Sequence, residues 1–195
     1  MRRTVLCCVA IVAGLASGAV TVHGNDGQSR RVYQTSHLNV FMTANPVGGA
    51  ATLLRGRNRL DMHVTTSGLN PNSSFSVWWV IFNNPEACDG PCNGPDLANP
   101  DVRGTVFWAA GFVTGADGTG YASGYVAAGA LPEGVDVEAG SGLRRGNGLG
   151  AEVHIVVRTH GMINLGHVHE QIGSFGGACN PTCANVQAAV FPPAS

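Results

Sequence analysis

The chain has 195 residues, enough for one domain, and a formal net charge of −1 from 11 basic and 12 acidic residues. Charged residues make up only 12% and hydrophobic residues 44% of the sequence, which excludes a solvated disordered tail and a charge-rich coiled coil. The near balance of charge also excludes the strongly basic surface of a nucleic-acid-binding protein.

The start of the chain has the pattern of an export signal. Two arginines precede an apolar stretch of about a dozen residues, from Val5 to Ala16, and the small residues Ser17-Gly18-Ala19 follow, with cleavage expected after Gly18, Ala19 or Gly24. This stretch is too short to span a bilayer, so we expect no transmembrane segment in the mature chain. A buried N-terminal strand is the alternative. We expect a secreted or periplasmic protein with a signal peptide over 1–24, a flexible N-terminus over 25–31 and one domain over 32–195.

After this start the sequence predicts one short strand after another. The stretch 75–82 is apolar at both odd and even positions, which is typical of a central strand buried on both faces. Gly56-Arg57-Asn58 and Asp117-Gly118 are turn formers that we expect to close hairpins. Further strands are expected over 31–41, 51–55, 59–66, 106–113, 119–127, 151–160 and 186–191. The predicted fold is all-β, a single-domain antiparallel β-sandwich of about 7–9 strands.

Four cysteines follow the leader as two C-x3-C pairs, Cys88 with Cys92 and Cys179 with Cys183. Turn-forming residues fill both intervals, and an oxidising compartment favours disulfides over free thiols. We therefore predict two disulfide-stapled loops. Each bridge would fix the shape of its loop, because closing so short a loop removes little entropy from the unfolded chain. A zinc site made from all four thiolates is the alternative.

Two of the predicted strands carry an acidic residue two positions before a histidine. Asp61 and His63 share the outer face of one strand, and Glu152, His154 and Arg158 share the outer face of another. If the strands are neighbours, these side chains converge on a patch suited to a metal or to an acid–base histidine. A solvated sheet face with cross-strand charge pairs is the alternative. The same alternation predicts that the core contains Met62, Val64, Val153, Ile155 and Val157.

A second candidate site lies near the C-terminus, where His167 and His169 are separated by one residue. On an extended segment their imidazoles would point the same way, an arrangement suited to copper or zinc, and His160 is close in sequence. Ordinary surface histidines are the alternative.

Three resemblances bear on these motifs. Gly166-His-Val-His-Glu170, with Gly173 and Cys179, resembles the copper-ligand strand of Cu,Zn superoxide dismutases, which are β-sandwich enzymes. This resemblance implies His167 and His169 as copper ligands and Cys179 as a disulfide partner. The segment 64–71 and the Asp-Gly turn at 117–118 resemble parts of secreted chordin-type (CHRD) domains.

The chain is also similar to a family of uncharacterised exported bacterial β-sandwich proteins. This similarity implies a shared fold and export. It is carried by the segments 78–88, 153–161, 169–172, 175–179 and 183–187.

Three classes of function fit these features. The leading hypothesis is an exported non-catalytic binding module for a small ligand or a transition metal, copper or zinc, held by a histidine cluster. The alternatives are an oxidoreductase of the superoxide dismutase type and a structural or cell-surface interaction domain. Metal content separates the first two from the third, and redox turnover separates the first from the second. The sequence does not indicate a protein partner.

Overall fold

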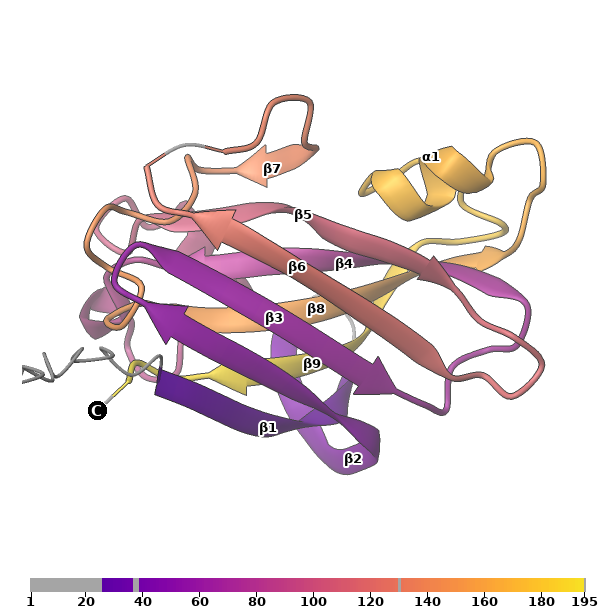
Figure 1. The fold of residues 1–195 in the computed structure, drawn as a ribbon, viewed down its shortest axis with the longest axis horizontal. Coiled ribbons are helices and arrows are strands. Elements are labelled where there is room, and N and C mark those ends of the chain that lie inside the picture. The colour runs from indigo at the N-terminus through magenta and orange to yellow at the C-terminus, as the bar shows by residue number, and fades with distance from the viewer. Residues whose placement is uncertain (1–25, 37–38, 130, 195) are drawn as a thin grey trace, which may run out of the picture.

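The computed structural model describes residues 26–36, 39–129 and 131–194, so the expected signal peptide lies outside the described residues (Figure 1). The described chain forms nine strands in one sheet, in the order β6-β3-β2-β1-β9-β8-β4-β5-β7, with antiparallel pairing throughout. The strands are β1 (Asp26–Ser36), β2 (Asn39–Gly56), β3 (Arg59–Thr66), β4 (Ser73–Phe82), β5 (Gly104–Val113), β6 (Gly120–Ala127), β7 (Val137–Ala139), β8 (Glu152–Met162) and β9 (Ala184–Phe191).

The sheet curls on itself until β6, at one edge, packs against β5, near the other edge (Figure 1). In Figure 1 β6, β3 and β2 form a front layer, and β5, β4, β8 and β9 lie behind them. The predicted all-β sandwich-like fold is confirmed. Helical structure in the described residues is limited to α1 (Val168–Gly173) and two 3-10 turns, η1 (Pro85–Ala87) and η2 (Gly94–Ala98). None of these helices is long and apolar enough to cross a membrane.

The two predicted hairpins turn out differently. β2 and β3 pair directly across Arg57 and Asn58, as expected. The Asp117-Gly118 turn also forms, with Gly118 at φ +64° and the Thr119 amide donating to Asp117 Oδ1 at 3.1 Å. The strands on either side do not pair with each other, because β5 hydrogen-bonds to β4 and β6 hydrogen-bonds to β3. This turn therefore connects the two layers, and the hairpin prediction is wrong there.

The main core lies between the two layers. Inward-facing side chains of β2 and β3 meet those of β4, β5 and β8, and burying each large apolar side chain contributes roughly 1.5–3 kcal/mol. All five residues assigned to the core by alternation are at most 2% exposed, which confirms the register of β3 and β8: Met62, Val64, Val153, Ile155 and Val157.

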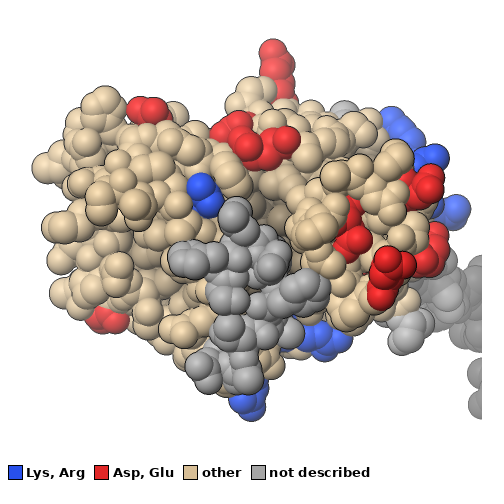
Figure 2. All heavy atoms as spheres, turned by 180° about the vertical axis from the view of Figure 1, so that it is seen from behind, with Lys and Arg blue, Asp and Glu red and all other residues tan. Residues whose placement is uncertain are grey.

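A second apolar cluster lies on the outer face of the back layer. Trp78, Val80 and Phe82 of β4 point outward and are covered by Cys92 and Val102 of the 83–103 loop. This cover explains why β4 is buried on both faces, as predicted. Figure 2 shows the molecule from this side, with acidic side chains at the upper part of the middle and at the end on the right.

Residues 26–31, which the sequence predicts as a flexible start, form the first part of β1. Each of them pairs with a residue of β2, from Arg55 opposite Asp26 to Ala50 opposite Arg31. Backbone pairing with the long β2 therefore gives this segment a strand partner.

Candidate functional site

Both predicted disulfides are confirmed. Cys88 bonds to Cys92 and Cys179 bonds to Cys183, with Cα–Cα distances of 5.4 and 5.2 Å. The two bridges lie in different surroundings. Cys92 is only 1% exposed inside the second apolar cluster, whereas Cys179 is exposed and Cys183 is half-buried.

His160 is fully buried near the end of β8, and both of its ring nitrogens have partners. Nε2 lies 2.8 Å from Ser76 Oγ, and Nδ1 lies 2.9 Å from the Gly177 carbonyl oxygen. Because a carbonyl only accepts, Nδ1 carries the proton and Nε2 accepts from the Ser76 hydroxyl. Trp78 Nε1 in turn donates to Ser76 Oγ at 2.7 Å. Burial lowers the pKa of His160 below its ordinary value of 6.5, so the neutral ring is favoured at pH 7.

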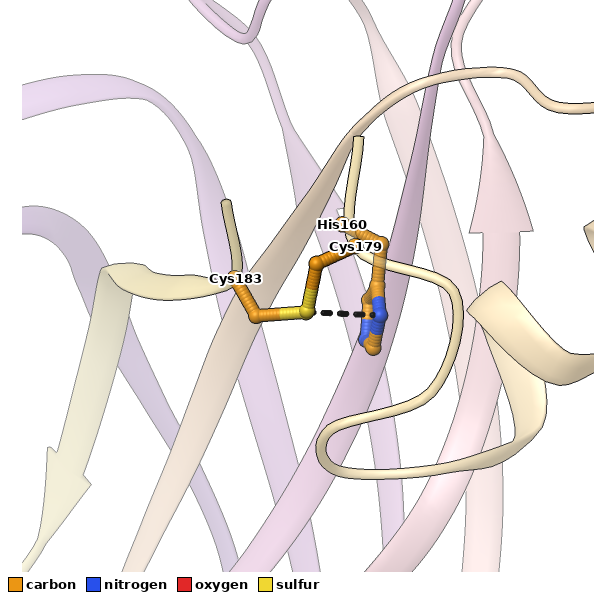
Figure 3. Close-up of side chains that lie close together, drawn as sticks. All are labelled: His160, Cys179 and Cys183. Carbon is orange, nitrogen blue, oxygen red and sulfur yellow. Dashed lines mark hydrogen bonds between the residues drawn. A yellow bond between two sulfur atoms is a disulfide. The ribbon is translucent and has the colours of Figure 1, made fainter. Parts of the chain in front are cut away.

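The imidazole of His160 also faces the second disulfide. Its Nδ1 lies 3.2 Å from Cys183 Sγ, and Figure 3 shows this contact. One ligand atom from each of His160, Cys179 and Cys183 lies within 4.8 Å of the others. Within the described ranges this is the one group of three or more histidine, cysteine, aspartate or glutamate side chains with the spacing of a metal site.

Backbone contacts hold the cysteine loop against β8 independently of the disulfide. The Asn180 amide donates to the His160 carbonyl at 2.7 Å, and the Met162 amide donates to the Asn180 carbonyl at 3.0 Å. Gly161, at φ +80°, makes this approach possible, since a Cβ there would overlap the Asn180 carbonyl.

Gln171 adds a side-chain anchor from α1 to the same loop. It is fully buried, and its Nε2 donates to the Ala178 and Met162 carbonyls, each at 3.0 Å. Its Oε1 accepts from the hydroxyl of Ser74 on β4 at 3.0 Å. The loop that carries the second disulfide is thus tied to two strands and a helix.

The structure does not bring His160 together with His167 and His169 as a ligand group. His167 precedes α1 and His169 lies in its first turn, so this segment is not the extended strand that the sequence predicts. The two imidazoles therefore do not share one face of a strand, and neither belongs to the group of side chains with the spacing of a metal site among the described residues. Both are exposed, and His167 Nδ1 lies 3.3 Å from Glu170 Oε2.

The two acidic–histidine pairs also lie apart, because β2, β1 and β9 separate β3 from β8 in the sheet. On β3, Asp61 accepts from the guanidinium of Arg59, and His63 Nδ1 lies 3.5 Å from the Tyr121 hydroxyl. These side chains are partly or fully exposed, as expected of an outer sheet face.

On β8, Glu152 and His154 are buried under the 83–103 loop, which carries the first disulfide, so the alternative of a solvated face does not hold for them. Glu152 Oε1 accepts from His154 Nε2 at 2.7 Å and from the Cys92 amide at 3.1 Å. His154 is 2% exposed and packs on the Phe82 ring, so this pair holds the loop in place. Arg158 donates to the Phe175 carbonyl at 2.7 Å and to Asn185 Oδ1 at 3.0 Å. It therefore ties the segment after α1 to the sheet.

Sequence reasoning missed the grouping of His160 with the second disulfide, and it missed Ser76 and Gln171 entirely. The C-x3-C pair and His160 can both be seen in the sequence, where Cys179 follows His160 by 19 positions. No local pattern indicates that the loop returns to β8, because that contact depends on Gly161 and on Gln171 of a helix too short to predict.

Comparisons with known proteins give little additional information. No family model and no curated protein sequence matches the chain. Among solved structures, a single mutant of a SOD-like protein from Bacillus subtilis is 16% identical, with a TM-score of 0.38 over 84% of this chain and 97% of that one. A double mutant of a SOD-like protein from the same organism is 15% identical, with a TM-score of 0.36 over 84% and 96%. The function proposed below rests on this chain's own residues.

Proposed function

We propose that the protein is an exported, non-catalytic binding module that holds one copper or zinc ion when the Cys179–Cys183 pair is reduced. The ligands are His160, Cys179 and Cys183. The observation that carries this proposal is the convergence of their ligand atoms within 4.8 Å.

The ligand set determines the class of metal. Two thiolates and one imidazole suit zinc(II) and copper(I), whereas magnesium and calcium prefer oxygen ligands. The thiolate is the form of cysteine that binds a metal, so the disulfide between Cys179 and Cys183 must be opened before loading. Metal binding is therefore coupled to the redox state of this pair.

The surroundings of His160 favour a bound metal at Nδ1. In that state the ring proton moves to Nε2, which donates to Ser76 Oγ across the existing 2.8 Å contact. A serine hydroxyl can donate or accept, so Ser76 supports both the disulfide form and the metal-bound form. A hydrogen bond to the second nitrogen is the usual way in which proteins orient a metal-binding histidine.

Binding is favoured over catalysis by the burial of the histidine. The imidazole is fully buried, which keeps it from acting as an acid or base on a molecule in solvent. General acid–base chemistry needs an acid or base within hydrogen-bond reach of the reacting atoms. If the copper-loaded protein consumed superoxide, the oxidoreductase alternative would be correct.

Metal titration tests the proposal. Fully reduced protein should bind one zinc or copper(I) ion per chain with a Kd below about 1 µM, a binding free energy near −8.2 kcal/mol. A competing chromophoric chelator reports this affinity under anaerobic conditions. The oxidised protein and a Cys179→Ser, Cys183→Ser variant should bind at least about 100-fold more weakly, the loss expected when soft ligands are removed.

The other cysteine pair provides a matched control. A Cys88→Ser, Cys92→Ser variant removes the same chemical groups at the same spacing, away from His160, and should keep the site. Binding that survives the loss of both Cys179 and Cys183, or that is missing from the reduced protein, would contradict the proposal. The protein would then be a structural or interaction domain or would hold its metal elsewhere.

Export is part of the same proposal, supported by the two disulfides and by the pattern of residues 1–24. Intact-mass analysis of the protein from its natural host should find a chain that begins after Gly18, Ala19 or Gly24. A cytoplasmic protein that retains residues 1–24 would contradict this part.

A further inference from the structure

We infer that the Cys179–Cys183 disulfide is a site of thiol–disulfide exchange, in which a low-molecular-weight thiol attacks Cys179 and Cys183 departs as a thiolate. This inference goes beyond metal binding and does not require it. It rests on the different surroundings of the two sulfurs and on a comparison with the other disulfide of the same chain.

Cys179 is the solvent-exposed half of the bridge. It lines an open cavity of about 360 Å³ together with Asn164, His167, Glu170 and Asn180. These neighbours offer amide, imidazole and carboxylate groups, which suit a small polar thiol that carries amides and charged groups of its own. An incoming thiolate therefore has space and polar partners on the Cys179 side of the bridge.

The sulfur of Cys183 is the better leaving group. Cys183 is half-buried, and the protonated Nδ1 of His160, which also faces the Gly177 carbonyl at 2.9 Å, lies 3.2 Å from its sulfur. When the bridge opens, negative charge develops on this sulfur, and the N–H group that it shares with Gly177 can donate a charge-assisted hydrogen bond to it. A stabilised leaving thiolate accelerates exchange, so access and leaving-group chemistry favour the same direction of attack.

The Cys88–Cys92 bridge lacks both advantages. Cys92 is 1% exposed and Cys88 is half-buried, and both pack in the second apolar cluster, so neither cysteine is exposed as Cys179 is. The sulfur of Cys92 lies 3.7 Å from the Pro85 carbonyl oxygen, which is an acceptor and cannot stabilise a thiolate. Among the described residues there is therefore one structural bridge and one exchangeable bridge, with the same spacing.

Opening the bridge completely consumes two external thiols, which supply the two electrons. The first, as RS⁻, bonds to Cys179 Sγ while the S–S bond breaks and its electron pair leaves with Cys183 Sγ. A second thiolate then attacks the RS sulfur and releases RSSR and the Cys179 thiolate. The bridge gains two electrons and the two external thiols lose two. Protons released by the thiols are available to the cysteine thiolates or to solvent.

Opening the bridge leaves its loop in place. The backbone bonds of Asn180 to His160 and Met162, and the bonds from Gln171 to Ala178 and Met162, do not involve the disulfide. Exchange is therefore compatible with the folded protein, and it frees both sulfurs beside His160. If the proposed metal site is correct, exchange is the step that opens it.

The test uses oxidised, metal-free protein in a chelator, so its outcome does not depend on metal binding. The folded protein is incubated with reduced glutathione, quenched with an alkylating agent and mapped by mass spectrometry without reduction. We expect glutathione on Cys179 and the alkyl group on Cys183. The Cys88–Cys92 bridge should open at least about tenfold more slowly. Equal opening of both bridges, glutathione mainly on Cys183, or reaction only after denaturation would overturn the inference.

Two variants test the role of His160, which is to place an N–H donor beside the sulfur of Cys183. His160→Leu removes the N–H group and should slow the first step by about tenfold or more, as expected for the loss of a hydrogen bond to a charged group. His160→Asn restores an N–H donor close to the Nδ1 position and should recover most of the rate. The Cys88–Cys92 bridge of each variant monitors unfolding, since its opening rate should not change. An unchanged or faster reaction at Cys179 in folded His160→Leu would overturn the role of His160.

Discussion

Ser76 and His160 form a hydrogen bond of 2.8 Å between two fully buried side chains, one on β4 and one on β8. This bond orients the imidazole so that its other nitrogen faces Gly177 and Cys183. Because Trp78 also donates to the Ser76 hydroxyl, the serine joins the second apolar cluster to the proposed metal site.

We predict that Ser76→Ala weakens metal binding by the reduced protein about 10- to 100-fold, the usual effect of losing a partner behind a metal-binding histidine. It should also lower the free energy of unfolding by about 1–3 kcal/mol, because His160 Nε2 and Trp78 Nε1 lose their partner. Metal titration and urea unfolding measure the two effects. Ser73→Ala is the matched control, since Ser73 lies on the same strand, is also buried and donates its hydroxyl to the Pro71 carbonyl, away from His160. A metal affinity of Ser76→Ala equal to that of the unchanged protein would show that Ser76 does not orient the ligand.

The competing histidine pair gives a second prediction. His167→Ala combined with His169→Ala should leave the metal affinity of the reduced protein unchanged within about threefold, because neither belongs to the group of side chains with the spacing of a metal site among the described residues. The same titration measures this. Loss of binding in this variant would place the site at the start of α1, as the superoxide dismutase resemblance implies.

The pH dependence of stability follows from the buried imidazole of His160. Burial lowers its pKa in the folded state below the ordinary 6.5, so the unfolded chain takes up the proton first as pH falls. The contribution of His160 to stability is therefore complete above 6.5 and decreases as pH falls from 6.5 toward the folded-state pKa. Urea unfolding of the oxidised protein at several pH values should show this decrease. His160→Asn should lack the part that His160 contributes, and identical pH profiles for the two proteins would contradict the assignment.

Arg55 gives a stability prediction away from the metal site. Its side chain is fully buried and donates to the carbonyls of Gly148, Ala151, Phe191 and Pro192 at 2.9–3.1 Å. Burial lowers its pKa to about 10, so it stays charged at pH 7. A lysine has one ammonium in place of the guanidinium fork, so Arg55→Lys should lower the free energy of unfolding by about 3 kcal/mol or more. Arg57→Lys, at an exposed position, should change it by less than about 0.5 kcal/mol. Similar unfolding curves for the two variants would contradict the role of Arg55.

The strands could be predicted largely from the alternation of apolar and polar residues. Alternation does not show what covers the outer face of a strand. Alternation assigns Val153 and Ile155 to the core correctly, but it cannot tell that a loop covers His154 on the other face. The Asp117-Gly118 turn was predicted from its residues. Whether a turn closes a hairpin or connects two layers depends on which strands pair, and that is decided by the whole sheet.

The candidate site could be predicted only in pieces. The cysteine pair and His160 were each recognised, and so was the disulfide. The contact between His160 and the cysteine pair depends on the backbone pairing of Asn180 with Gly161. These two residues lie far apart in the sequence, so no local pattern predicts that they pair. The H-x-H motif was more conspicuous, but its geometry depended on an extended conformation that the short α1 does not provide.

The most direct test of the proposed metal site is X-ray absorption spectroscopy of the zinc-loaded, reduced protein. Two sulfur neighbours at about 2.3 Å and at least one imidazole nitrogen at about 2.0–2.1 Å are expected for a site formed by Cys179, Cys183 and His160. The sulfur signal should vanish in the Cys179→Ser, Cys183→Ser variant and persist in the Cys88→Ser, Cys92→Ser variant. A zinc ion with only nitrogen and oxygen neighbours, or with four sulfurs, would contradict the proposed site.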